Sequence, residues 1–167
     1  MDAYKAVIGK RDRRDFDASR PLSDEALGRI LQAGRMAGSS SNSQPIRLIV
    51  IRDQKTREAL VPLGRGTAQL VQAPVAVAVL LKKGARDFDV GRTVQNMMVA
   101  AWSEGIISCP VGIQQREPAQ AILGYPEDYE LSICSTFGYP APAEPSGEPR
   151  ESRPRLPIDE LVHWEKW

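Results

Sequence analysis

Residues 75–81 form the segment that most constrains how this 167-residue chain can fold. All seven of these residues are apolar, and Pro74 stands directly before them. A strand with one face in water alternates apolar and polar residues, whereas a strand that is apolar on both sides is covered on both faces of its sheet. The segment therefore predicts a buried strand, and the length of the chain suits one domain with a real core.

Further strands and helices are predicted on both sides of this segment. Residues 47–51 predict a central strand, and residues 131–137 predict another strand. Residues 106–113 predict a strand that lies at a sheet edge or has an irregular end, because Pro110 has no amide hydrogen to donate to a neighbouring strand. Helices are expected at residues 2–9, after Ser23, after Asp53, at 67–72, at 89–104 with Gly105 behind it, and at 116–123.

The composition argues against several classes of protein. Hydrophobic residues make up 42% and charged residues 26% of the chain, as in soluble globular proteins. The net charge of +1 argues against a broad nucleic-acid surface. No apolar run reaches the length of a membrane span and the first residues do not form a signal peptide, so a cytoplasmic protein is expected.

The few cysteines and histidines restrict the possible chemistry. The only histidine, His163, lies near the C-terminus, which excludes a histidine-rich metal site. Cys109 and Cys134 lie in apolar surroundings and are expected to be buried free thiols in a reducing compartment.

A run of short polar side chains at residues 36–45 lies between a predicted helix and a predicted strand. It contains four serines, one asparagine and one glutamine. Ser, Asn and Gly are common in plain connecting loops. The same dense set of hydrogen-bonding groups, held by rigid elements on both sides, suits a polar planar ligand. The composition of the loop leaves both interpretations open.

Residues 10–16 are strongly basic, with four cations in the five positions from Lys10 to Arg14. Most such runs are solvated surface. The alternative is an anion site, because guanidinium groups match a phosphate with two-point contacts and lysine adds a point charge.

The C-terminal part of the chain differs in composition from the rest. Six prolines between residues 140 and 157 exclude helix and favour an extended arm. The arm ends in a segment that contains Trp164 and Trp167, and these large apolar side chains need a surface to cover them. That surface belongs either to a second subunit or to the same one.

Taken in order, these segments resemble the FMN-dependent nitroreductase family over nearly the whole chain. The segments that carry the resemblance are residues 10–16, 37–45, 89–105, 138–140 and 153–158. The resemblance implies an α+β fold, a three-layer α/β/α sandwich with a mainly antiparallel sheet. It also implies an FMN-binding domain at residues 1–140 and an extended C-terminal arm at 141–167 that is exchanged with the partner subunit of a homodimer.

The resemblance also implies which residues contact FMN at the subunit interface. Arg14 would lie by the N1–C2=O edge of the ring, where a fixed cation favours the reduced flavin. The backbone near Pro110 would approach N5. The full set of implied cofactor contacts is Lys10, Arg11, Arg153 and Arg155 at the phosphate, Asp12 and Arg14 on the same edge, Ser39, Ser40, Asn42 and Gln44 from the other subunit, and Val111 and Gly112 at N5.

The function that the resemblance implies is electron transfer from NADH or NADPH to a small planar acceptor, nitroaromatic or quinone-like, by a ping-pong mechanism. No catalytic side chain and no metal are expected, because the cofactor carries the chemistry. Two alternatives remain: a flavin-destructase-like enzyme that makes dimethylbenzimidazole, and a non-catalytic flavin-binding protein.

The chain departs from the family pattern at three positions. Asp12 replaces a usual serine, and its carboxylate must be offset by its arginine neighbours or point away from the phosphate. The resulting Arg-Asp-x-Arg pattern resembles the destructase branch. Gly38 replaces a usual proline and Ile46 a usual tryptophan, which loosens the expected packing beside the ring.

Overall fold

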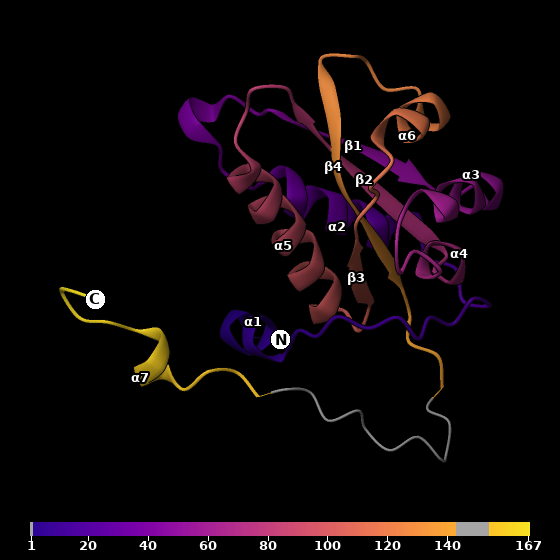
Figure 1. Cartoon of the computed structure of the whole chain (residues 1–167). Helices are drawn as coiled ribbons and strands as arrows, with labels where there is room; N and C mark the ends of the chain where they lie inside the picture. Colours follow the sequence, from indigo (N-terminus) through magenta and orange to yellow (C-terminus); the bar gives the residue numbers. More distant parts are fainter. Residues whose placement is uncertain (1, 143–153) are drawn as a thin grey trace.

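The computed structural model describes residues 2–142 and 154–167 (Figure 1). The elements in chain order are α1 (Ala3–Gly9), α2 (Asp24–Arg35), η1 (Ser40–Asn42), β1 (Ile46–Ile51), α3 (Gln54–Leu60), η2 (Val61–Leu63), α4 (Gln69–Gln72), β2 (Val75–Lys82), α5 (Asp87–Ser103), β3 (Ile107–Val111), α6 (Arg116–Leu123), β4 (Tyr129–Gly138) and α7 (Ile158–Leu161). None of the helices in these described ranges has the length and apolar character needed to cross a membrane.

The four strands form one sheet in the order β1-β2-β4-β3, and every neighbouring pair is antiparallel. Val77, in the middle of β2, pairs with Val50 on one side and with Ser135 on the other. Pro110 lies in β3 at the sheet edge, as its sequence predicts.

The prediction of a central strand at residues 47–51 is wrong. In the described chain β1 pairs with β2 alone and leaves its second edge open. Within β1 only Ile51 is buried, and Val50 is 37% exposed. An apolar run does not distinguish an edge strand from a central one, because both bury at least one face.

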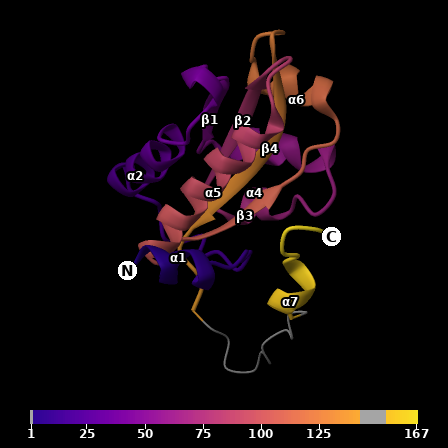
Figure 2. The same ribbon diagram turned by 90° about the vertical axis from the view of Figure 1, so that its left-hand side faces the viewer.

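Helices cover both faces of the sheet and complete the predicted three-layer sandwich. The odd-numbered residues of β2, such as Val77, pack against Ile30 of α2 and Met97 of α5. Residues of the other parity pack against α3, α4 and α6. Figure 2 shows α2 and α6 on opposite sides of the sheet. All seven residues 75–81 are at most 2% exposed, which confirms the prediction made from their apolar run.

Short polar side chains and glycines fix where the helices begin and how closely they pack. Ser23 caps α2 by accepting a hydrogen bond from the Ala26 amide at 3.2 Å, and Asp53 caps α3 in the same way. A Cβ at Gly34 would lie 2.7 Å from Cγ of Met97, so this glycine allows α2 and α5 to approach closely. These contacts hold the two helices that cover one face of the sheet.

Both cysteines are free and buried, as expected from the sequence. Burial raises the pKa of the Cys134 thiol to about 12, and it also raises the pKa of the Cys109 thiol. Both groups are therefore protonated thiols at neutral pH, whereas thiolates are the reactive form.

We predict that neither cysteine reacts readily with an aromatic disulfide reagent at pH 8 in the native protein. The same reagent should titrate both thiols once guanidinium chloride has unfolded the chain. Absorbance of the released thiolate reports the two stages. Rapid release from the native protein would contradict the burial of these groups.

Candidate functional site

The basic segment lies along the outer edge of β3. Asp12 forms a parallel bridge with Ser108, and the Arg13 amide donates to the Ser108 carbonyl at 3.1 Å. Further along, Phe16 bridges Pro140 beyond the end of β4. Backbone hydrogen bonds therefore hold the segment in an extended form beside the sheet, and they fix where its side chains leave the backbone.

Pro110 ends this edge pairing and leaves a carbonyl group for a side chain. Proline has no amide hydrogen, so the ladder cannot continue through it. Its carbonyl accepts a hydrogen bond from Nε2 of Gln69 at 3.2 Å. The other end of the same amide, Oε1 of Gln69, accepts from Nε of Arg14 at 2.7 Å. Gln69 thus connects the basic segment to the end of β3, and it is only 3% exposed.

These groups line a cavity of about 330 Å³ beside the end of β3. Its lining residues are Arg14, Arg65, Gly66, Ala68, Gln69, Gln72, Pro110, Val111 and Gly112. The structure therefore brings together three of the residues predicted from the sequence, Arg14, Val111 and Gly112. Gln69 and Arg65 were not predicted, because nothing in the sequence marks the burial of Gln69 or the position of Arg65 beside the end of β3.

A buried arginine holds the short helix that carries Gln69. Arg57 of α3 is only 6% exposed. Its Nη1 donates hydrogen bonds to the carbonyls of Leu70 and Ala73 at the end of α4. Its Nε has no hydrogen-bond partner among the described residues. Because the last carbonyls of a helix lack partners within the helix, this guanidinium satisfies them and ties α4 to α3.

Lys10, Arg11 and Asp12 form local contacts in this structure. Nζ of Lys10 forms an ion pair with Asp12 and lies 3.6 Å from the Met98 sulfur. The carboxylate of Asp12 is thus paired with Lys10 and with neither of its arginine neighbours. Nη1 of Arg11 donates to the carbonyl of Ile8 at 2.8 Å and to that of Lys10.

Arg13 is paired within the segment as well. Its guanidinium donates two hydrogen bonds to Asp15, and these lower the pKa of the Asp15 carboxyl below its usual value. Arg14 differs from Arg13 because its contact is with the neutral amide of Gln69. Arg14 therefore keeps its positive charge uncompensated by a carboxylate of the described residues.

The polar loop before β1 has an unusual backbone. Ser41, Asn42 and Gln44 have φ angles of 51°, 54° and 48°, in the left-handed region that residues other than glycine seldom adopt. Oγ of Ser39 accepts a hydrogen bond from the Gln44 amide at 2.9 Å and closes the loop. Three such residues in one short loop mark strain of the kind found at binding sites. Ser40 is exposed together with Asn42 and Gln44.

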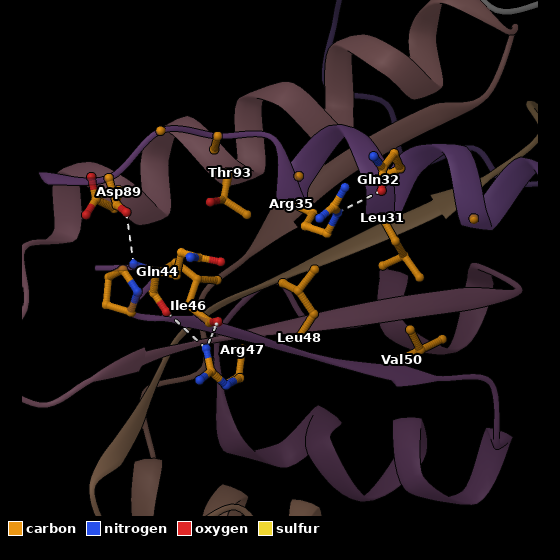
Figure 3. A pocket seen from close by; sticks show the side chains of 16 residues that line it. Leu31, Gln32, Arg35, Gln44, Ile46, Arg47, Leu48, Val50, Asp89 and Thr93 are labelled. Carbon is orange, nitrogen blue, oxygen red and sulfur yellow. Dashed lines mark hydrogen bonds between the residues drawn. The ribbon is translucent and has the colours of Figure 1, made fainter. Parts of the chain in front are cut away.

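The loop borders a second cavity, of about 550 Å³, between α2, β1 and the start of α5. Figure 3 shows Leu31 of α2 and Leu48 of β1 along its apolar part, with Gln44 at the end formed by the loop. Asp89 and Thr93 of α5 also line this cavity. The open edge of β1 thus has a groove beside it.

One chain does not bring the two groups of predicted residues together. The basic segment lies beside β3 and the polar loop precedes β1, and these strands form opposite edges of the sheet. Figure 1 shows the loop and α1 at opposite ends of the molecule. Arg155 is exposed in the described range 154–167, and Arg153 lies outside the described residues. The predicted site residues of a single subunit therefore lie in two separate groups.

We predict that Gln69→Leu lowers the free energy of unfolding by about 1–3 kcal/mol, because the substitution leaves Nε of Arg14 and the carbonyl of Pro110 without a partner. Urea denaturation followed by circular dichroism measures this change. Gln72→Leu is the matched control, since Gln72 lines the same cavity but is exposed. Equal stabilities for the two variants would show that the Gln69 contacts contribute nothing.

Comparison with known proteins agrees with this geometry. A sequence model described as the nitroreductase family matches residues 7–85. The chain is 26% identical over 204 residues to an NADH dehydrogenase of Thermus thermophilus, covering 98% of this chain and 96% of that protein. It is 23% identical over 193 residues to the FMN reductase [NAD(P)H] of Bacillus subtilis, covering 99% of this chain and 74% of that protein.

A solved structure shows the same fold. Nitroreductase A from Vibrio parahaemolyticus superposes with a TM-score of 0.87 at 23% sequence identity, covering 100% of this chain and 77% of that one. The family match, the relatives along the whole chain and the shared fold agree with one another. The chain is therefore similar to the nitroreductase family, and the relatives that match it along its length carry the names of oxidoreductases.

Proposed function

We propose that this protein is an FMN-dependent oxidoreductase that passes electrons from NADH or NADPH to a small planar acceptor, nitroaromatic or quinone-like, by a ping-pong mechanism. The observation that carries the proposal is the fixed Arg14 guanidinium beside the Val111–Gly112 backbone, in one cavity at the end of β3. The names of the Thermus and Bacillus relatives support the nicotinamide donor and the flavin.

The residues at this cavity fit the flavin ring. FMN, when bound, supplies the redox chemistry by accepting a hydride at N5 and gathering negative charge at its N1–C2=O edge. Gln69 uses only Nε of Arg14, so the Nη groups of that arginine are available to face such a charge. A cation fixed in advance stabilises developing charge without having to reorganise. The Val111 and Gly112 backbone would meet the N5 edge.

The phosphate would lie near Lys10 and Arg11, with Arg153 and Arg155 from an arm. The Lys10 ammonium has three donors, and its ion pair with Asp12 leaves others for a phosphate oxygen. Asp12 then orients Lys10 and reduces the net positive charge on this edge of the site. Arginine and lysine together neutralise a phosphate dianion by charge-assisted hydrogen bonds.

The complete site needs a homodimer. Ser39, Ser40, Asn42 and Gln44 of one subunit would serve the ribityl chain and ring held by the other, because a single chain keeps the two half-sites apart. Residues 1–140 would form the FMN-binding domain, and 141–167 an arm exchanged between subunits. Five large apolar side chains in the described part of the arm are more than 60% exposed and lack cover in one chain: Leu156, Ile158, Leu161, Trp164 and Trp167.

A cytoplasmic location completes the proposal, because two buried free thiols suit a reducing compartment. The destructase alternative has no comparable support, since the carboxylate that suggested it is held in an ion pair with Lys10.

The visible spectrum of the full-length protein tests the proposed function. The purified chain, supplied with FMN, should show a flavin band that bleaches under anaerobic NADH or NADPH and returns on addition of a quinone. Arg14→Gln should slow bleaching by about 100-fold, the effect of losing one fixed electrostatic contact to developing charge.

Arg13→Gln is the control for this experiment, because Arg13 is paired with Asp15. The bleaching rate of this variant should lie within about threefold of that of the unmodified chain. Failure to take up FMN would contradict the whole proposal. A flavin band that no nicotinamide bleaches would leave only a binding protein, and loss of the band in air with dimethylbenzimidazole formation would select the destructase.

Truncation after Pro140 tests the exchanged arm. We predict that the shortened chain sediments as a monomer and loses FMN, because both the apolar anchors and Arg155 are removed. Circular dichroism should still show the helices and strands of the sandwich. A shortened chain that remains dimeric and yellow would show that the arm has neither role.

A further inference from the structure

Arg65 is an exposed cation at the same cavity as Arg14, and the proposed function gives it no role. It lines the cavity at the end of β3 together with Gly66 and Gly112. Its guanidinium forms no ion pair and no hydrogen bond with residues 2–142 or 154–167. The Arg65 guanidinium can therefore interact with a bound molecule without first breaking a contact within the protein.

The backbone that carries Arg65 is firmly held. The Arg65 amide donates to Oε1 of Gln114 at 2.8 Å. The amides of Gln114 and Gln115 in turn donate to the Leu63 carbonyl at 2.9 and 3.0 Å. These three hydrogen bonds join the turn at residues 64–66 to the chain that leaves β3. Arg65 therefore projects from a fixed turn, although its side chain is exposed.

Two glycines place this turn directly against the end of β3. A Cβ at Gly64 would lie 2.5 Å from the Gly112 carbonyl oxygen, which no other residue tolerates without moving the backbone. Gly66 has a φ of 68°, in the left-handed region. The turn thus touches the backbone that would face N5, and Arg65 begins beside the place where an acceptor would stack.

We propose that Arg65 selects acceptors that carry an anionic group, such as a carboxylate on a planar ring. This inference rests on the proposed function and names the class of acceptor for that site. The cavity lining contains two arginines and, within the described chain, no acidic residue, so its potential is positive. A guanidinium pairs with a carboxylate in a planar two-point contact.

The flavin ring would occupy this cavity in the proposed function, so the acceptor would stack on that ring beside the turn at residues 64–66. A carboxylate on the acceptor would then gain a contact with Arg65. A neutral ring of the same shape would gain the stacking contact alone.

The test compares 4-nitrobenzoate with 4-nitrobenzamide, two acceptors that differ in charge at nearly constant shape. The ratio of their kcat/KM values is measured with NADH on the FMN-saturated full-length protein. Arg65→Gln should lower this ratio about tenfold, as expected for one partly exposed charge-assisted contact, and leave turnover of the amide within about twofold. Arg65→Lys should keep part of the preference.

Lys55→Gln is the charge-matched control, because Lys55 is an exposed cation on α3 outside the cavity lining. It should leave the ratio unchanged. Added salt should lower the ratio for the unmodified protein, because screening weakens an exposed charge contact.

Equilibrium binding of the same two compounds separates this inference from the proposed function. If neither these compounds nor a quinone is reduced, the oxidoreductase proposal fails, while the ratio of dissociation constants still measures the role of Arg65. An unchanged ratio in Arg65→Gln, in turnover or in binding, overturns the inference. If Arg65→Gln lowers kcat/KM for NADPH more than for NADH and leaves the acceptor ratio unchanged, Arg65 contacts the nicotinamide donor. That result would also overturn the inference.

Discussion

The burial of β2 on both faces is the constraint on which the rest of the structure depends. Each Val or Leu in it contributes about 1.5–3 kcal/mol only when apolar side chains cover it. Helices α2 and α5 provide this cover on one face and α3, α4 and α6 on the other. Because β2 has β1 and β4 as neighbours, β3 becomes an edge strand, and the basic segment lies along that edge.

The groups proposed to face the flavin lie where pairing along the outer edge of β3 ends. Pro110 ends the pairing of the basic segment along the outer edge of β3, although β3 stays paired with β4. The carbonyl of Pro110 accepts a hydrogen bond from Gln69, which also holds Arg14. Arg57 secures the helix that carries Gln69 by satisfying the last carbonyls of that helix. The interior of the sandwich thus determines where the site lies, and a few buried polar contacts determine which way its cation points.

The sequence predicts most of the fold and part of the site. The apolar run of β2, the edge position of Pro110 and the bounds of α6 follow from local pattern alone. The edge position of β1 does not follow from the pattern, because an apolar strand has the same sequence pattern whether it has one neighbouring strand or two. The basic segment and the polar loop stand out by composition, but their expected contacts with FMN come from the resemblance to a family. Gln69 and Arg65 were not found, because their roles depend on contacts with residues about 40–50 positions away in the chain.

Complementation between two defective chains tests the central claim, that each flavin is held by the basic segment of one subunit and the polar loop of the other. Arg14→Ala damages the first half-site and Ser40→Asp the second. Refolded together, the two variants should form mixed dimers in which one of the two sites is intact and binds FMN as tightly as the unmodified protein. If the mixture binds FMN no better than either variant alone, the two half-sites do not combine across subunits and the account is wrong.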